Sequence, residues 1–275
     1  MKCSIIAADR IDQLKEIWRK CYPEDPESYI DFFFKNGFQY SKCVGISDAE
    51  QVIGVIYLFP CYIAETDKKA YYFYAGGVLP SYRGKGCYRR LIAYAAEYCI
   101  RNEYEMLCYP LPSLRQFYEQ MGFTEQYYYA VSKITESDIL NGCDELKIQP
   151  VQPSELLNIM RFHAQYGDVL WDESVMEYVC REYQFSGGIC CKLFVNDIAH
   201  YMFYKKDGEK LIVTDTSVSL ERIKRLSGSL MEHSQTKQIV VWHRVYADDK
   251  SSRVLSSIGS LKIHNPSKWY VLTML

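Results

Sequence analysis

One stretch of the sequence combines residue types that could bind a phosphate group. In residues 77–91 a strand-like run ends, a glycine-rich basic turn follows, and a helical pattern begins. Backbone N–H groups at a helix N-terminus lack intrahelical partners and lie at the positive end of the helix dipole. Gly84 and Gly86 allow the backbone to approach an anion closely, and Arg83 and Lys85 add positive charge. The pattern predicts a pyrophosphate site.

A glycine-rich turn alone is more often only a turn, so the elements around it matter. An aromatic strand over 70–79 precedes it, and a helix over 87–102 with an apolar stripe follows. Downstream come a strand over 106–109, a short helix over 113–121 closed by Gly122, and a strand over 123–134. Upstream, the pattern predicts a strand over 3–8, a helix over 9–21 with Asp9 as N-cap, a helix over 27–36, and a hairpin of strands 40–46 and 52–59.

The second half of the sequence repeats this order after a break at 141–144. A strand over 146–151 and a helix led by Ser154 repeat the opening. The further segments 173–178, 210–220, 239–243 and 252–259 align with 27–32, 70–79, 106–109 and 115–122, and a hairpin at Asn196-Asp197 aligns with the one at Asp48. Six segments matching in order indicate two copies of one α+β fold. We expect domains of residues 1–143 and 144–275, each a mixed, mostly antiparallel sheet flanked by helices.

The turn also resembles a family signature. Arg83-Gly84-Lys85-Gly86-Cys87-Tyr88 is similar to the acetyl-coenzyme A motif of the Gcn5-related N-acetyltransferases (GNAT), usually Arg/Gln-x-x-Gly-x-Gly/Ala. Tyr88 departs from it, because glycine or alanine is usual there. The resemblance implies an acetyl-coenzyme A site formed by Val78, Leu79, Pro80, Arg83, Gly84, Lys85, Gly86, Cys87 and Tyr88.

A second motif follows. Phe117-Tyr118-Glu119 with Gly122-Phe123 resembles the segment in which a GNAT tyrosine protonates the departing thiolate, which gives this role to Tyr118. Leu111 stands where an asparagine is common. The resemblance implies direct transfer to a primary amine on strands that part near Val78, without a covalent enzyme intermediate. The general base stays open among Tyr72, Tyr74, Glu65, Glu105 and the Leu275 carboxylate, which tandem relatives can place in the active site.

The tandem arrangement is similar to acetyltransferases of the enhanced-intracellular-survival type, with a degenerate second copy. Where the first copy has Arg83–Gly86, the second has Glu221-Arg222-Ile223-Lys224 without glycine, and Leu255 stands at the place of Tyr118. We expect this copy to bind no coenzyme A and to supply packing and one wall of the acceptor pocket. Acidic residues beside Trp171 would suit a cationic acceptor, although a solvated loop and helix N-terminus is the commoner reason for them. They are Asp168, Asp172 and Glu173.

Composition narrows the function class. The 275 residues carry a net charge of −2, which argues against a general nucleic-acid binder. The 11 cysteines form no CxxC pair and His is scarce, which favours reduced thiols in a cytoplasmic protein without a metal site. The longest apolar run, 52–64, is too short to span a bilayer, so no membrane partner is expected. Two alternatives stay open: a catalytically idle acyl-coenzyme A binding or sensing module, and transfer of a longer acyl or aminoacyl group. The acceptor, the acyl length and the oligomeric state stay undetermined.

Overall fold

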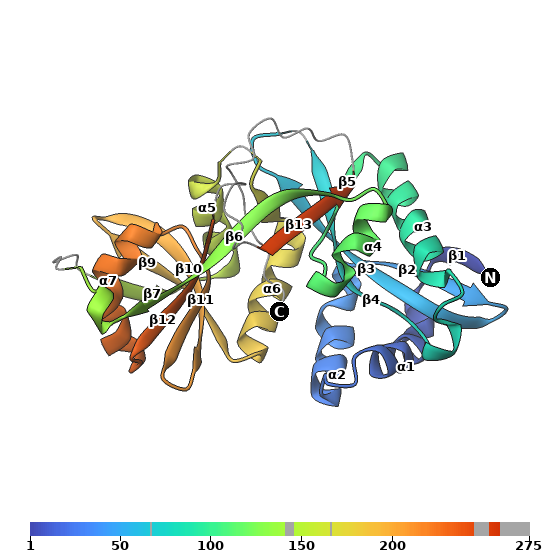
Figure 1. The fold of residues 1–275 in the computed structure, drawn as a ribbon, viewed down its shortest axis with the longest axis horizontal. Coiled ribbons are helices and arrows are strands. Elements are labelled where there is room, and N and C mark those ends of the chain that lie inside the picture. Colours follow the sequence, from blue (N-terminus) through green and yellow to red (C-terminus); the bar gives the residue numbers. More distant parts are fainter. Residues whose placement is uncertain (67, 141–145, 166, 245–252, 259–275) are drawn as a thin grey trace. The chain divides into compact units, whose positions relative to one another are not determined.

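The computed structural model describes residues 1–66, 68–140, 146–165, 167–244 and 253–258 (Figure 1). These form two compact units. The first contains residues 1–62, 68–126 and 255–258, and the second contains 63–66, 127–140, 146–165, 167–244 and 253–254. The domain boundary expected between residues 143 and 144 lies outside the described residues, and the division into 1–143 and 144–275 stays a proposal.

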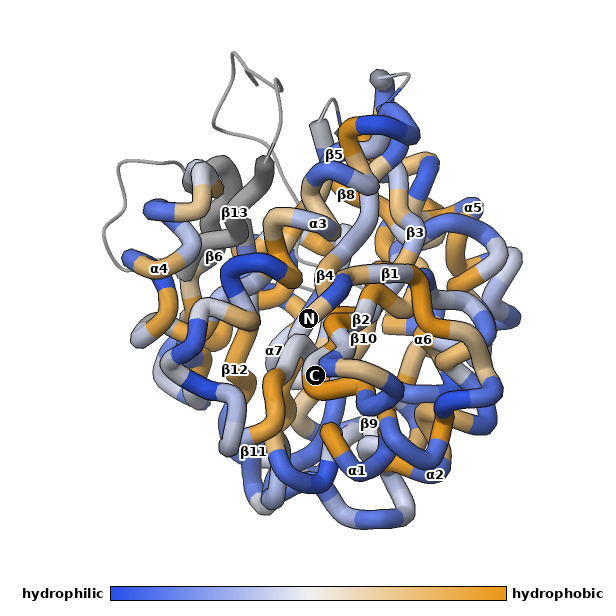
Figure 2. The backbone as a smooth tube through the Cα atoms, turned by 90° about the vertical axis from the view of Figure 1, so that its right-hand side faces the viewer, coloured by the Kyte–Doolittle hydropathy of each residue, from blue (hydrophilic) through white to orange (hydrophobic). Residues whose placement is uncertain are grey.

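The first unit is built on one mixed sheet. Its strands are β1 (Lys2–Ile5), β2 (Lys42–Asp48), β3 (Gln51–Ile63), β4 (Lys69–Val78), β5 (Tyr104–Cys108) and β13 (Arg253–Ile258), side by side in that order. Only β4 and β5 are parallel; the other neighbours in this series run antiparallel. The long strand β3 is buried along most of its length, and Figure 2 shows apolar stretches along strands and polar stretches at turns.

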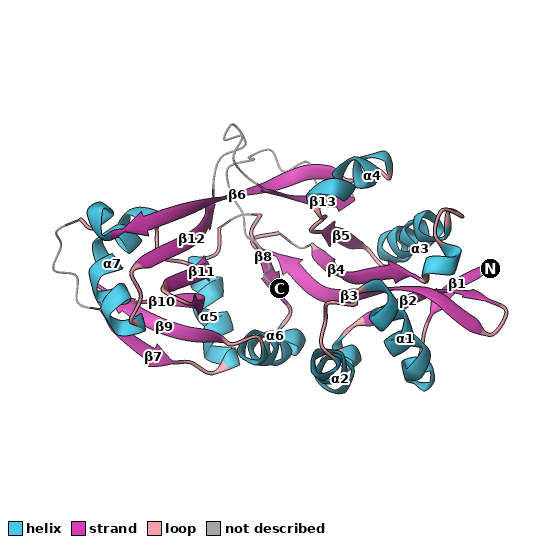
Figure 3. Ribbon diagram, turned by 60° about the horizontal axis from the view of Figure 1, so that its bottom comes forward, coloured by secondary structure: helices cyan, strands magenta, loops and turns pink. Residues whose placement is uncertain are grey.

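Four helices accompany this sheet: α1 (Ile11–Cys21), α2 (Glu27–Asn36), α3 (Cys87–Arg101) and α4 (Arg115–Gln120). Helices α1 and α2 lie on one side of the sheet and α3 on the other (Figure 3). Buried Leu14, Ile17 and Trp18 explain the position of α1, because they share one helical face. The predicted apolar stripe of α3 is buried as well: Leu91, Ile92, Ala95, Ala96 and Cys99.

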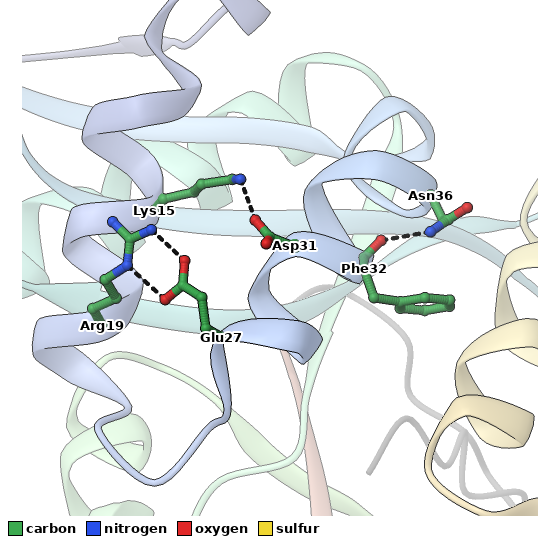
Figure 4. Close-up of polar contacts among 6 residues, drawn as sticks. All are labelled: Lys15, Arg19, Glu27, Asp31, Phe32 and Asn36. Carbon is green, nitrogen blue, oxygen red and sulfur yellow. Dashed lines mark hydrogen bonds and ion pairs between the residues drawn. The ribbon is translucent and has the colours of Figure 1, made fainter.

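Two ion pairs connect α1 with α2, and a side-chain hydrogen bond lies within α2 (Figure 4). Lys15 binds Asp31, and Arg19 binds Glu27, while the Asn36 side chain donates to the Phe32 carbonyl at 2.9 Å within α2. The hydrogen bond from Lys15 lowers the pKa of the Asp31 carboxyl. Exposed pairs of this kind contribute little to the free energy of unfolding, so their main effect is to orient the two helices.

The second unit repeats the order of the first. Its elements are β7 (Lys147–Pro150), α5 (Pro153–His163), β8 (Val169–Trp171), α6 (Glu173–Phe185), β9 (Gly188–Val195), β10 (Ile198–Asp207), β11 (Lys210–Thr216), α7 (Leu220–Ser234) and β12 (Gln238–Arg244). Strands β11 and β12 are parallel and joined by α7, as β4 and β5 are joined by α3. The predicted α+β class and the two copies are confirmed.

The sheet of the second unit has the strand order β6-β12-β11-β10-β9-β7. Strand β6 (Thr124–Thr135) directly follows α4 in the chain, yet from residue 127 onward it belongs to this unit and pairs with β12. Buried apolar side chains from β6, β9–β12 and α7 form the core, including Ile134, Val213 and Leu226. Short 3-10 turns complete the chain: Ala8–Arg10, Phe38–Tyr40, Pro80–Tyr82, Pro112–Leu114 and Glu136–Asp138.

Two local expectations are wrong. Asp9 is not the N-cap of α1, because it lies inside the 3-10 turn Ala8–Arg10 and Arg10 occupies the cap position without a side-chain bond. Residues 252–259, aligned above with a helix, contain strand β13 instead, and Ser256 pairs with Cys108 of β5. Since β6 pairs in the second unit, the outer edge of β5 is open to another strand, and a sheet edge is stabilised by pairing.

Within the part of the chain that the structure describes, no helix is both long and apolar enough to cross a membrane.

Gly228 in the middle of α7 offers a test of the helix. A β-carbon at this position would meet no atom closer than Ile139 Cγ2, at 4.0 Å. Alanine loses less backbone entropy than glycine in a helix, so Gly228→Ala is expected to raise the free energy of unfolding by about 0.5–1 kcal/mol. Urea unfolding measures the change, and a lower midpoint would contradict the environment described for α7.

His200 predicts a pH dependence of stability in the second unit. Its buried ring stacks on His163 with centroids 4.4 Å apart, and its Nδ1 lies 3.0 Å from Ser217 Oγ. Burial, then the charge of His163, lowers the pKa of His200 from 6.5 to about 4. Below pH 6.5 the His200 imidazole takes up a proton in the unfolded chain, but in the folded protein it stays neutral until the pH approaches 4. The free energy of unfolding therefore falls as the pH is lowered from 6.5 toward 4.

Between pH 7 and pH 4.5, we expect the free energy of unfolding to fall by about 1–3 kcal/mol more in the wild type than in His200→Gln. Urea unfolding of both proteins at the two pH values measures this difference, which also removes the contribution of carboxylates common to both. Equal losses would show that His200 does not resist protonation.

Candidate active site

A β-bulge in β4 opens the first unit's sheet. Val55 pairs with Gly77 and Tyr57 pairs with Tyr74, so β4 has one residue more than β3 over this stretch. Ala75 in the bulge has a φ of +45°, a strained value for a residue with a β-carbon. The parallel pairing of β4 with β5 ends at Phe73 opposite Cys108. Strand β5 ends at Cys108, so within the described residues no strand pairs with the last residues of β4 on that side.

Successive residues of the bulge face opposite sides of the sheet at close range. A β-carbon on Gly77 would lie 2.6 Å from Cys21 Sγ of α1, and one on Gly76 would lie 2.6 Å from Tyr88 Oη of α3. Real β-carbons do not approach other atoms so closely, so both positions require glycine unless their neighbours move. The paired glycines in the sequence were the available signal for this bulge.

A pocket of about 560 Å³ lies at this end of β4. It contains several residues of the predicted acetyl-coenzyme A site, namely Val78, Arg83, Gly84, Gly86, Cys87 and Tyr88. It also contains residues that the sequence analysis did not predict, namely Cys21, Tyr22, Gly76, Gly77, Tyr82, Arg89, Leu111, Leu114 and Phe117. The other predicted residues do not line it: Leu79, Pro80, Lys85 and Tyr118.

The glycine-rich turn has the geometry of an open anion site. Gly84 and Gly86 have φ values of +73° and +74°, and a β-carbon on either would have no atom within 4 Å. Gly86 is the N-cap of α3, with no side chain capping the helix and no acidic residue in its first turn. The first amides of α3 are therefore available to a ligand, and Arg83 and Arg89 of the pocket lining are cationic.

The side chains of Arg83 and Lys85, two residues of the predicted site, each contact a neighbouring group of the protein. The guanidinium of Arg83 donates from Nε to the Val78 carbonyl at 3.2 Å, which holds it against the end of β4. The ammonium of Lys85 lies 5.2 Å from the centre of the Tyr82 ring, and the Tyr82 hydroxyl lies 3.3 Å from Asp48 Oδ2. Both cations therefore lie beside the turn.

Three tyrosine hydroxyls gather around the bulge. Tyr22 Oη donates to the Gly76 carbonyl at 2.7 Å, and Tyr88 Oη lies 2.9 Å from Tyr118 Oη. Tyr118 is only 5% exposed. Burial, and then the neighbouring Cys108, raises the pKa of its phenol. Tyr118 therefore keeps its proton at neutral pH, as a general acid requires.

The four candidates for the general base that the structure describes do not line this pocket. The Tyr74 hydroxyl bonds to the Tyr29 hydroxyl, and buried Glu105 accepts from Lys68 Nζ at 3.2 Å. Tyr72 is buried, and Glu65 is exposed and belongs to the second unit. Leu275 lies outside the described residues.

The acidic residues near Trp171 have structural partners. Asp168 Oδ2 accepts from the Gln165 amide at 2.8 Å, and Asp172 is the N-cap of α6, accepting from the Ser174 amide at 3.0 Å. Glu173 is 3.4 Å from Arg161. These contacts favour the loop and helix-cap interpretation over a role in acceptor binding.

In the second copy, the N-terminus of the corresponding helix, α7, is capped by a side chain. Ser219 caps α7 and accepts from the Arg222 amide at 3.3 Å, and Glu221 places a negative charge in the first turn. An amide that is bonded to serine is not available to a phosphate, and the carboxylate would repel one. The helix start of α7 therefore lacks the open anion geometry of α3.

A protein-family model matches the first part of the chain. Residues 3–125 match the family model described as "Acetyltransferase (GNAT) domain". No curated protein matches the sequence. The matched segment includes the bulge of β4, the glycine-rich turn and α4.

Solved structures share the fold over 93% of this chain. A conserved protein of Enterococcus faecalis V583, named "Probable N-Acyltransferase", is 13% identical, with a TM-score of 0.75 and 72% of its own length covered. Eis1 of Mycobacterium abscessus is 14% identical, with a TM-score of 0.67 and 72% coverage. A tandem GNAT protein from the clavulanic acid biosynthesis pathway is 11% identical, with a TM-score of 0.52 and 97% coverage. The chain has the tandem GNAT fold, similar to Eis.

Proposed function

We propose that this protein is an acetyl-coenzyme A-dependent N-acetyltransferase that acts on a primary amine of a small molecule or peptide. The open turn at the N-terminus of α3 is the observation that carries the proposal. Its two glycines at positive φ, uncapped amides and flanking cations fit a pyrophosphate, and the pocket continues from there to the bulge of β4.

The co-substrate would be held by the first unit alone. Val78, Leu79 and Pro80 lead from the end of β4 into the turn, and Arg83, Gly84, Lys85, Gly86, Cys87 and Tyr88 surround the anion site. Bound there, acetyl-coenzyme A supplies an acetyl group activated as a thioester. The end of β4 would bind the pantetheine arm through its backbone, on the side where the pairing with β5 has ended.

Tyr118 would supply the proton that the departing thiolate requires. Its buried phenol is protonated at neutral pH, and its hydroxyl bonds to Tyr88, which lines the pocket. No residue of the chain needs to carry the acetyl group, because both substrates can bind together and react directly. We further propose that the second copy binds no coenzyme A and that the protein works in the cytoplasm without a nucleic-acid or membrane partner.

A turnover assay tests the proposal. The protein is incubated with acetyl-coenzyme A and a panel of amines covering polyamines, amino sugars, aminoglycosides and peptide N-termini, and thiol release is followed with a chromogenic disulfide. We expect release above the rate of hydrolysis with at least one amine, together with an acetylated product by mass spectrometry. Acetyl-coenzyme A binding without transfer to any amine would favour the idle binding module, and faster turnover of longer acyl thioesters would correct the acyl group.

A further inference from the structure

Arg89 lies in the first turn of α3, shortly after the cap residue Gly86, and it is exposed. It lines the same pocket as the glycine-rich turn, together with Phe117 of α4. The Arg89 guanidinium carbon lies 5.4 Å from the centre of the Phe117 ring, and Nη1 lies 3.3 Å from the sulfur of Met121, the C-cap of α4. The side chain of Arg89 therefore connects α3 with α4 beside the pocket.

The positive charge of Arg89 has no acidic partner among the described residues. A ring face and a thioether stabilise a guanidinium without neutralising it, whereas Arg115 of α4 pairs with Glu119 at 3.2 Å. Arginine carries five N–H donors in one plane, and within the described part of the chain only Nη1 of Arg89 has an acceptor. The contact with Phe117 orients this plane, so the other donors can bind an anion with little further loss of side-chain entropy.

Acetyl-coenzyme A carries phosphate at two places, namely the pyrophosphate and a phosphomonoester at the 3′ position of the adenosine ribose. The uncapped amides of α3 and the cations Arg83 and Lys85 beside the turn fit the pyrophosphate. The phosphomonoester has a second pKa of about 6 and so carries close to two negative charges at neutral pH. A planar guanidinium fits this group, because two N–H groups can bond two of its oxygens at once.

The direction of the co-substrate in the proposed binding mode favours Arg89 for the second phosphate. The pantetheine arm runs from the turn toward the bulge of β4, so the adenosine half, on the other side of the pyrophosphate, leaves the turn in another direction. Tyr88 and Arg89 are adjacent in α3, but they reach different places. The Tyr88 hydroxyl lies beside Gly76 of the bulge, whereas the Arg89 guanidinium lies beside Met121 at the end of α4.

We propose that Arg89 binds the 3′-phosphate of acetyl-coenzyme A and makes the site selective for this co-substrate over its 3′-dephospho form. The inference rests on the proposed function, because it requires acetyl-coenzyme A in this pocket. The 3′-phosphate is remote from the thioester, so Arg89 contributes to the binding of the co-substrate and not to the chemical step. Its contribution is therefore measured as a dissociation constant.

Calorimetric titration of the whole chain with coenzyme A and with 3′-dephospho-coenzyme A tests the contact. Arg89→Gln should weaken coenzyme A binding by about tenfold and leave binding of the dephospho form within about twofold of wild type, because only coenzyme A has the phosphate. Arg89→Lys should recover part of the loss, since it restores the charge without the planar fork. Equal weakening of both ligands in Arg89→Gln, or no change in either, would overturn the proposal.

Arg90→Gln is the matched control. Arg90 is the next residue of α3 and is also exposed, but its Nη2 donates to the Met1 carbonyl at 3.0 Å and it does not line the pocket. The variant removes the same charge from the same helical turn, so it measures the effect of net charge alone. The ratio of the two dissociation constants should stay within about twofold of wild type. A change as large as that in Arg89→Gln would refute a specific contact.

The same titrations separate this inference from the proposed function. If the wild type shows the expected preference for coenzyme A, and acetyl-coenzyme A transfers no acetyl group to any amine, the proposed activity fails and the assignment of Arg89 stands. If the wild type transfers acetyl groups but binds both ligands equally well, the assignment of Arg89 fails and the activity stands. Binding of neither ligand would refute both.

Discussion

Replacing Gly86 by glutamate is expected to weaken acetyl-coenzyme A binding by about a hundredfold or more. Gly86 caps α3 at a φ of +74°, with open space where a side chain would begin. A carboxylate there would occupy the anion position and repel the pyrophosphate. At about 6 Å and an effective dielectric constant of about 20, one pair of like charges costs about 3 kcal/mol, which is about two orders of magnitude in the dissociation constant.

Gly208→Glu is the matched control. Gly208 also has a positive φ, +56°, and a β-carbon there would have no atom within 4 Å, but it lies in the second unit between β10 and β11. Both variants introduce the same side chain at a left-handed position, with a similar backbone cost. Acetyl-coenzyme A should raise the thermal midpoint of wild type and Gly208→Glu by mass action, and not that of Gly86→Glu. An equal rise in all three would show that the turn at Gly86 is not the anion site.

Tyr118→Phe is expected to lower kcat by about ten- to a thousandfold while the acetyl-coenzyme A dissociation constant stays within about twofold. The substitution removes the hydroxyl that bonds to Tyr88 and keeps the ring against Phe123. Because burial raises the pKa of Tyr118 above 10, wild-type activity should not fall through loss of this proton up to pH 10. Steady-state kinetics and a pH profile check both statements.

Tyr183→Phe separates this effect from the general cost of losing a buried hydroxyl. Tyr183 is buried in the second unit, and its hydroxyl lies 2.7 Å from Thr214 Oγ1. This variant should lose some stability, because Thr214 Oγ1 keeps only its hydrogen bond to the Phe203 carbonyl, and it should keep kcat. If Tyr118→Phe also keeps kcat, its hydroxyl does not serve as the acid.

Most of the fold follows from local patterns in the sequence. Residue spacing predicts the buried stripes of α1 and α3 and the strand–turn–helix order around Gly86. The second half of the sequence repeats the order of elements. The local sequence does not predict strand β13. This strand forms on the edge of β5, and that edge is open because β6 pairs with β12 instead. The start of α1 differs from the prediction for a local reason, because Asp9 lies in a 3-10 turn and Arg10 takes the N-cap position.

The candidate site was predictable in part. The two turn glycines and Arg83 line the pocket because a strand followed by a helix start places them together. Cys21 and Tyr22 come from the end of α1, and no spacing in the sequence connects them to the turn. The Tyr88–Tyr118 contact likewise depends on the packing of α3 against α4, so the sequence shows only that Tyr88 is unusual.

The most direct test of the central claim is a calorimetric titration of the whole chain with acetyl-coenzyme A. The first copy has an open helix start at Gly86, and the second has one closed by Ser219 and Glu221. We predict one binding site per chain, lost in Gly86→Glu and kept in Gly208→Glu. Two sites per chain, or one site that survives Gly86→Glu, would contradict the assignment of acetyl-coenzyme A to the first unit.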